Sequence, residues 1–197
     1  PSVFEPHIGE EAFVTADQAA GDQGGLKAHV RGLYRMGRTS KEARPVSNPT
    51  AAMIVIGDEI LSGRTRDANM YHLAGALTGH GIDLYEVRVV ADDPPAIIGA
   101  VQALSASYDH VFTTGGIGPT HDDITADCVA EAFGLSLDVR ADALAILEAY
   151  YETSGQELND ARLRMARVPE GAELIENPVS HAPGFTLRNV HVMAGVP

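Results

Sequence analysis

The sequence has little cysteine and lysine, and it lacks a long apolar run. Its single cysteine, Cys128, cannot form an internal disulfide, which favours a reducing compartment and predicts a cytoplasmic protein. Apolar residues never continue for the roughly 18 positions that a membrane-spanning helix needs. The N-terminus, which opens with Pro1, shows no signal-peptide pattern. We therefore expect a protein without a membrane segment.

Positive charge is scarce and unevenly placed along the chain. Lysine occurs only at Lys27 and Lys41, and residues 46–197 hold 21 acids against 8 arginines, so this segment carries the entire net charge of −13. Nucleic acids and anionic membranes are bound mainly through Lys and Arg, so the balance argues against both as partners. Without lysine, residues 46–197 also hold no P-loop, whose motif ends in GK[ST].

The change in charge divides the chain into two parts. Residues 1–48 have scattered apolar residues and clustered glycines, which predicts a poorly structured N-terminal extension. The alternative is an over-extended reading frame with a natural start near Val46. Residues 49–197 are regular and form the predicted domain, and an overall apolar content of 45% is enough for a sizeable core.

Apolar runs and amphipathic stripes alternate along residues 49–197. Strands are predicted at 52–56, 82–90 and 109–112, helices after each of them and at 141–151 and 157–167, and a hairpin around 188–189. This order predicts an α/β protein in which helices cover a largely parallel sheet. In such folds, ligands bind at the edge where the carboxyl ends of the strands meet.

The stretch TTGGIGPTHDDITAD, from Thr113 to Asp127, joins a predicted strand to a predicted helix. Glycine lets a ligand approach the backbone, and a helix N-terminus attracts anions. A tight connection without a ligand would also use these glycines. The adjacent acids Asp122 and Asp123 repel each other unless a cation lies near them, although one of them could simply cap the helix. Since Mg²⁺ prefers one or two carboxylates plus phosphate oxygens, the loop predicts a phosphate and metal site.

Acidic residues also follow the first two strands. Asp58 and Glu59 come directly after the first strand, and Asp92 follows the second. The loops at the carboxyl ends of parallel strands lie along one edge of the sheet, so we expect these acids beside the glycine-rich loop, where Asp58 and Glu59 suit a polar heterocycle. A polar turn and a helix cap are the alternatives. The Pro/Gly-rich turns at 177–185 and 194–197 either reverse the chain or line the same pocket.

Four motifs in this order carry a family resemblance. GDEILSG…DAN, TTGGIGPTHDDIT, PEGAELIENPVSHAPGF and GVP resemble the N-terminal domain of the competence/damage-inducible protein A (CinA) family, within the wider molybdopterin-binding (MoaB/Mog-like) superfamily. The resemblance covers about residues 50–197 and implies a three-layer α/β/α sandwich with a mixed, mostly parallel sheet. The sequence departs from the family at Ser180, where many relatives have glycine, and at Ala194, where many have proline. It stops at GVP, where relatives continue, which favours a domain truncated at its C-terminus.

The resemblance also implies a function. The ligand would be a phosphorylated pterin such as molybdopterin, or a nucleotide such as ADP-ribose, bound with a divalent metal (Mg²⁺, Mn²⁺ or Co²⁺). It favours hydrolysis of a nucleotide pyrophosphate, with adenylyl transfer to molybdopterin or non-catalytic pterin binding as alternatives. Relatives form dimers, trimers or hexamers, so a homo-oligomer is expected. Asp92 and Asp123 match positions for catalysis and metal binding. Ligand contacts are implied for Asp58, Glu59, Thr114, Gly115, Gly116, Gly118, Pro119, Thr120, Asp122, Asn177, Ser180, Pro183 and Gly184.

Overall fold

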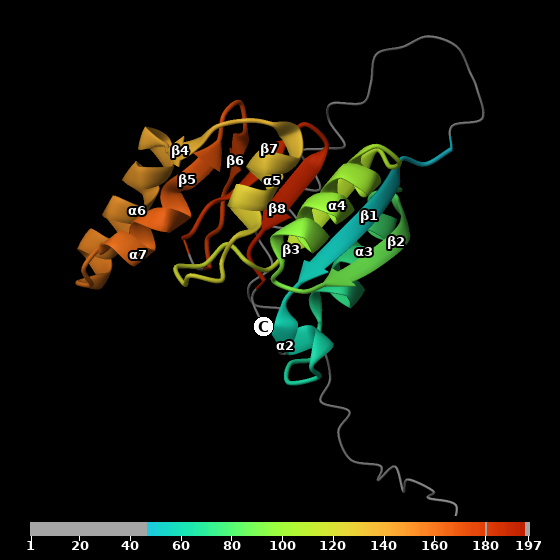
Figure 1. Ribbon diagram of the computed structural model, residues 1–197, viewed down its shortest axis with the longest axis horizontal. Coiled ribbons are helices and arrows are strands. Elements are labelled where there is room, and N and C mark those ends of the chain that lie inside the picture. Colours follow the sequence, from blue (N-terminus) through green and yellow to red (C-terminus); the bar gives the residue numbers. More distant parts are fainter. Residues whose placement is uncertain (1–46, 180, 196–197) are drawn as a thin grey trace, which may run out of the picture.

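A computed structural model describes residues 47–179 and 181–195 (Figure 1). The extension predicted for residues 1–48 therefore lies almost entirely outside the described residues, and Ser180 lies outside them as well. Within the described part, no helix combines the length and the apolar character that crossing a membrane requires.

A six-stranded sheet forms the centre of the fold. Its strands are β1 (Thr50–Ile56), β2 (Asp83–Val90), β3 (His110–Thr114), β6 (Glu173–Ile175), β7 (Gly184–Leu187) and β8 (Val190–Met193). They follow the order β2-β1-β3-β8-β7-β6. The pairs β2–β1, β1–β3 and β3–β8 are parallel, whereas β7 is antiparallel to both β8 and β6. The sheet is thus mixed and mostly parallel, which confirms the fold class predicted from the sequence.

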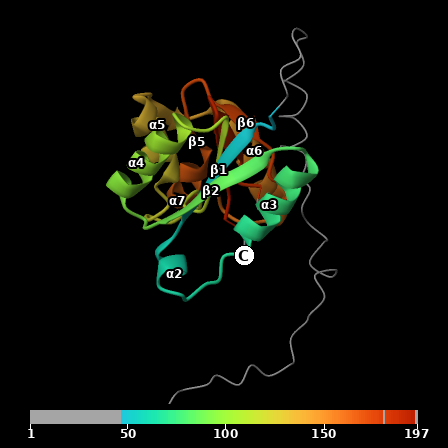
Figure 2. The same ribbon diagram turned by 90° about the vertical axis from the view of Figure 1, so that its right-hand side faces the viewer.

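Helices cover both faces of the sheet. Helix α3 (Asn69–Gly79) lies on one side of β1 and β2, and α4 (Pro94–Ser105) lies on the other (Figure 2). Successive side chains of a strand point to opposite faces. In β1, Ile54 and its alternate neighbours therefore join the core under α4, while Met53 and Val55 pack with α3. This two-sided burial explains why β1 is apolar without interruption, and it makes the domain a three-layer sandwich.

A smaller unit follows α5 (Thr125–Phe133). Strands β4 (Leu137–Val139) and β5 (Arg167–Pro169) form an antiparallel pair, and α6 (Ala141–Ser154), α7 (Asp160–Leu163) and the 3₁₀ turn η1 (Arg164–Ala166) lie between them in the chain (Figure 1). The prediction of a helix at 157–167 was wrong in both the length and the end of the helix. Its last residue, Arg167, belongs to β5. The backbone hydrogen-bonding groups of β5 pair with β4, a strand that is distant in sequence.

At the start of α4, two neighbouring acids have different roles, which the sequence left open. Asp93 is the N-cap, and its carboxylate accepts a hydrogen bond from the N–H of Ala96 at 3.2 Å. Pro94 and Pro95 occupy the first turn, where a missing N–H has no cost. Because Asp93 caps the helix, Asp92 is left to face the neighbouring loop.

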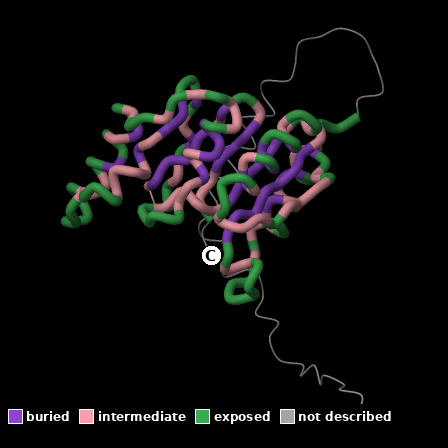
Figure 3. Tube along the Cα trace, viewed as in Figure 1, coloured by how far each residue is buried: buried purple, intermediate pink, exposed green. Residues whose placement is uncertain are grey.

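Cys128 is buried in α5, with 2% of its surface exposed, as the sequence predicted. Figure 3 shows the buried positions running through the central strands and the helices against them. Burial raises the pKa of this thiol to about 11, and only the thiolate reacts readily. We therefore expect no labelling of the native protein by dithionitrobenzoate at about pH 8, and one equivalent after unfolding in guanidinium. Rapid labelling of the native protein would contradict the buried placement.

Candidate functional site

The loops that follow β1, β2, β3 and β8 meet at one edge of the sheet. The N–H of Asp58, after β1, donates to the carboxylate of Asp92, after β2, at 2.9 Å. Gly195, after β8, lies against Gly115, after β3, since a Cβ on Gly195 would come within 3.0 Å of the Gly115 nitrogen. This is the edge at which ligands bind in open α/β sheets, and the predicted residues of the loops after β1, β2 and β3 lie along it.

The segment between β3 and α5 requires glycine at two positions. Gly115 and Gly116 have φ angles of +101° and +67°, and an added Cβ would lie 2.2 Å from the Ile56 carbonyl oxygen or 2.2 Å from Thr125 Oγ1, respectively. Thr125 also donates its hydroxyl to the Gly115 carbonyl at 3.0 Å and its N–H to the Gly116 carbonyl at 2.9 Å. The glycine-rich loop is therefore held between β1 and the first residue of α5.

Asp123 shapes the far end of this loop. Its Oδ2 accepts hydrogen bonds from the N–H and the hydroxyl of Thr120, at 2.8 and 2.6 Å. A Cβ on Gly118 would come within 2.7 Å of the same carboxylate. Pro119, Thr120 and Asp122 are exposed on the turn that results. Asp123 thus orders the loop, and its role in catalysis or metal binding stays a prediction.

Four acids gather beside the loop. Asp58 and Glu59 form the first turn of α2 (Asp58–Leu61), and Asp122 comes from the glycine-rich loop. Burial raises the pKa of Asp92, and the charges of Asp58, Glu59 and Asp122 raise it further, against the opposing effect of the Asp58 N–H. Such crowding of like charges favours a nearby cation. The charges of the other three acids and the hydrogen bond from Asp58 all act on Asp92, which is therefore the centre of this acidic group.

The acidic group fits a particular kind of metal site. Among the described residues, no three His, Cys, Asp or Glu side chains converge closely enough to hold a metal ion by themselves. Mg²⁺ commonly binds through one or two carboxylates and completes its coordination with phosphate oxygens and water. The donors present here would suit a divalent cation only where a phosphorylated ligand completes its coordination, and the metal-binding roles of Asp92 and Asp123 stay predictions.

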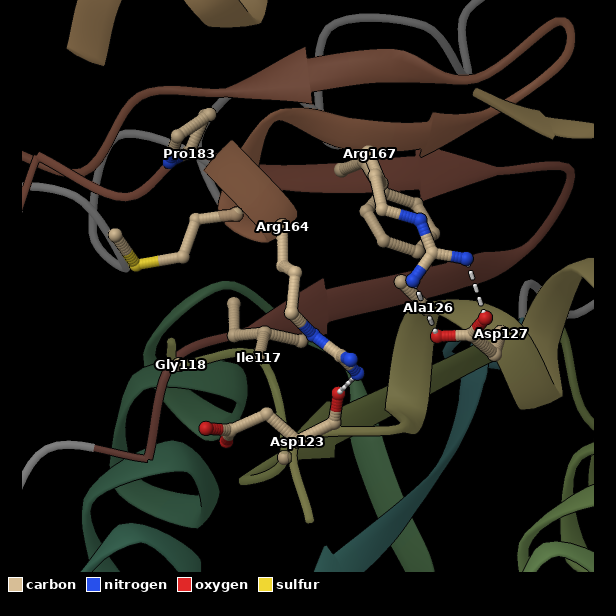
Figure 4. Close-up of a pocket in the computed structure, with 11 residues that line it drawn as sticks. Ile117, Gly118, Asp123, Ala126, Asp127, Arg164, Arg167 and Pro183 are labelled. Carbon is tan, nitrogen blue, oxygen red and sulfur yellow. Dashed lines mark hydrogen bonds and ion pairs between the residues drawn. The ribbon is translucent and has the colours of Figure 1, made fainter. Parts of the chain in front are cut away.

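A pocket opens on the other side of the glycine-rich loop, between the loop, α5, η1 and Pro183 (Figure 4). Two arginines of the η1–β5 segment line it. Arg167 forms a two-bonded ion pair with Asp127 of α5, at 2.5 and 3.3 Å. Arg164 reaches from η1 to the loop, where its Nη2 donates to the carbonyl oxygen of Asp123 at 3.4 Å. The pocket thus holds two guanidinium groups together with the carboxylates of Asp123 and Asp127.

The remaining predicted residues divide between the site and its supports. Pro183 lines the pocket. Asn177 holds the turn before β7, because its amide donates to the Ala182 carbonyl at 3.0 Å and accepts from the Val179 N–H at 3.1 Å. Gly184 is needed within the sheet, where a Cβ would come 2.4 Å from the Val192 carbonyl oxygen.

Two threonine side chains at the end of β3 have hydroxyl groups to which a ligand or a water molecule can bond. The hydroxyls of Thr113 and Thr114 are buried and have no hydrogen-bond partner within residues 47–179 and 181–195. Thr114 was among the predicted ligand contacts, and it ends β3 directly before the glycine-rich loop. A buried hydroxyl without a partner is unfavourable, so its occurrence at this edge agrees with a site that is completed by a bound group.

Arg164 and Arg167 were missed by the reasoning from sequence. They lie in a segment that was predicted to be an ordinary helix, and their approach to the glycine-rich loop depends on the fold of α6, η1 and β5. One signal was nevertheless present. Residues 46–197 hold only 8 basic residues against 21 acidic ones, so each arginine in this segment is a candidate for a specific electrostatic role.

Sequence comparisons find a family model and relatives that match this chain. A model of the family described as "Probable molybdopterin binding domain" matches residues 52–197. A CinA-like protein of Citrifermentans bemidjiense is 41% identical over 150 residues, which cover 74% of this chain and 36% of that protein. A protein of Caldivirga maquilingensis is 36% identical over 151 residues, covering 75% of this chain and 59% of that protein. The chain therefore spans only part of the length of the curated relatives it matches.

Solved structures show the same fold. The crystal structure of the protein CinA with unknown function from Thermoplasma acidophilum matches with a TM-score of 0.70 and 36% identity, over 77% of this chain and 91% of that one. The molybdopterin biosynthesis enzyme MoaB of Thermus thermophilus matches with a TM-score of 0.50 and 16% identity, over 76% and 82% of the two chains. At that identity, the second match shows a shared fold alone.

Proposed function

Since this chain belongs to the molybdopterin-binding domain family, with CinA-like proteins among its relatives, we propose that it is a metal-dependent nucleotide pyrophosphatase. The proposed substrate class is a nucleotide diphosphate ester such as ADP-ribose. The CinA resemblance supports this choice. The glycine-rich loop and the acidic group at the carboxyl ends of the strands support it as well.

One observation carries the proposal: the glycine-rich loop and the acidic group are adjacent. The loop backbone is held by Ile56 and Thr125 in a conformation that only glycine accepts, and Asp122 of the same loop is close enough to Asp92 to raise its pKa. A diphosphate needs main-chain amides for its oxygens and a cation for its charge. The loop would supply the amides, and the acidic group beside it would hold the cation.

Covalent catalysis has little part in the proposed hydrolysis. Hydrolysis forms a bond from phosphorus to a water oxygen, breaks the bridging P–O bond, and releases two phosphomonoesters and a proton to the solvent. Phosphoryl transfer of this kind depends mainly on positioning and on neutralising charge. The glycine-rich loop would position the phosphates, and Asp92, with Asp58 or Asp122, would hold a divalent cation that neutralises charge developing on the phosphate oxygens.

The test is a screen of the purified protein with ADP-ribose, ATP and molybdopterin, each with Mg²⁺, Mn²⁺ and Co²⁺. We expect AMP and ribose 5-phosphate from ADP-ribose in the presence of metal, and no products after chelation. AMP–molybdopterin formed from ATP would instead show adenylyl transfer. Molybdopterin binding by calorimetry without turnover under any metal would show a binding module, and either result would overturn the hydrolase proposal.

A further inference from the structure

Arg164 is a cation without an anionic partner at the edge of the pocket. The ion pairs between arginines and acids in the described part of the chain engage Arg88, Arg140 and Arg167, and Arg164 takes part in none of them. Its Nε is buried and has no hydrogen-bond partner in the part of the chain that the structure describes. The contact of its Nη2 is the neutral carbonyl of Asp123, at the long distance of 3.4 Å.

Arg164 is half-buried, so part of its guanidinium is in contact with water, but its buried Nε lacks a hydrogen bond among the described residues, which is unfavourable without a ligand. Removing a charged group from water costs free energy unless hydrogen bonds and an opposite charge compensate for the loss. The domain is strongly acidic, so acids to pair with Arg164 are abundant in the sequence. The two carboxylates nearest the pocket have other contacts: Asp127 is paired with Arg167, and Asp123 is bonded to Thr120.

The direction of the side chain places this charge in the pocket. Figure 4 shows Arg164 reaching down from η1 to the loop between Ile117 and Asp123, with Pro183 on the opposite side of the pocket. The cavity volume of about 20 Å³ is room for about one water-sized group, so a single phosphate oxygen fits inside it and a heterocycle does not. The start of α5 lies beside it at Thr125, whose own N–H is already bonded to the Gly116 carbonyl oxygen.

We propose that Arg164 and the backbone of Gly116–Gly118 form an anion subsite that binds a phosphate group of the ligand. This inference rests on the proposed function and extends it, because a diphosphate would then place one phosphate beside the cation at Asp92 and the other against Arg164. Either a phosphomonoester, as on a pterin, or the internal phosphate of a dinucleotide supplies the required oxygens.

The experiment compares Arg164→Gln, Arg164→Lys and the control Arg162→Gln. Arg162 is two residues earlier and bonds to Gln156 and the Glu157 carbonyl, away from the pocket. Inorganic phosphate, AMP and ADP-ribose are titrated by calorimetry without metal, and KM and kcat for ADP-ribose are measured with Mg²⁺. Comparing AMP with ADP-ribose tells a terminal phosphate from an internal one.

We expect Arg164→Gln to raise the Kd for phosphate and the KM for ADP-ribose by about tenfold or more, with a much smaller change in kcat. Arg164→Lys keeps the charge and should lie between this variant and the wild type, while Arg162→Gln should match the wild type. Arg164→Lys also serves as the reporter if Arg164→Gln unfolds. Wild-type phosphate affinity in a folded Arg164→Gln variant, or no phosphate binding by the wild type, overturns the subsite.

The two proposals fail in distinguishable ways. Metal-dependent hydrolysis of ADP-ribose that is unchanged in Arg164→Gln would refute the subsite and leave the hydrolase intact. Phosphate binding that depends on Arg164 in a protein without turnover would refute the hydrolase and leave the subsite intact.

Discussion

Replacing Asp92 by asparagine is expected to lower kcat for ADP-ribose hydrolysis by about 10²- to 10³-fold while the protein stays folded. The Asp58 N–H donates to this carboxylate at 2.9 Å, and the amide oxygen of asparagine can accept the same bond, so the contact between the two loops is kept. What the variant loses is the negative charge that would hold the cation. Steady-state release of AMP with saturating Mg²⁺ measures the effect.

The same variant has a second expected signature, in stability. Burial and neighbouring acids raise the pKa of Asp92, so its ionised form is unfavourable in the folded protein without metal. Asp92→Asn should therefore raise Tm at about pH 7. A raised pKa means that the wild type regains stability as the pH falls, so the gain should disappear below the ordinary Asp value of 3.8. Added Mg²⁺ should stabilise the wild type more than the variant.

Asp93→Asn is the matched control for both measurements. Asp93 is adjacent in sequence but caps α4, and asparagine is an equally good N-cap. Its kcat and its response to Mg²⁺ should therefore equal those of the wild type. Full activity in Asp92→Asn, or equal losses in the two variants, would remove Asp92 from the site.

Replacing Gly115 by alanine is expected to lower the free energy of unfolding by about 2–4 kcal/mol. Its φ of +101° is unfavourable for a residue with a side chain, and the new Cβ would meet the Ile56 carbonyl oxygen at 2.2 Å. That oxygen belongs to the main chain of β1, which is paired on both sides, so it cannot move aside cheaply. Urea denaturation followed by circular dichroism measures the change.

Gly99→Ala tests whether this loss is specific to the loop. Gly99 is exposed within α4, and an added Cβ would have no neighbour within 4 Å. Alanine is favoured over glycine inside a helix, so this variant should gain about 0.5–1 kcal/mol. If Gly115→Ala proved as stable as Gly99→Ala, the crowded loop described here would be incorrect.

Local patterns in the sequence were sufficient for much of the fold. The unbroken apolar run of β1 predicts burial on both faces, and the structure places its side chains alternately under α3 and α4. The glycines at 115, 116 and 118 predicted either the approach of a ligand or a tight connection, and the groups that lie close to them belong to the protein itself: Ile56, Thr125 and Asp123. The approach of a ligand stays a prediction. These features are encoded by neighbouring residues, which is why they could be predicted.

By itself, the sequence determined a parallel-sheet domain, an acidic surface and a glycine-rich loop between a strand and a helix. Only the tertiary structure decided that Asp93 caps α4 while Asp92 faces Asp58, and that residue 167 enters β5. It also decided that Arg164 reaches the glycine-rich loop from a segment far along the chain. These outcomes depend on partners distant in sequence, because the contact that settles each of them forms only when separate elements pack together.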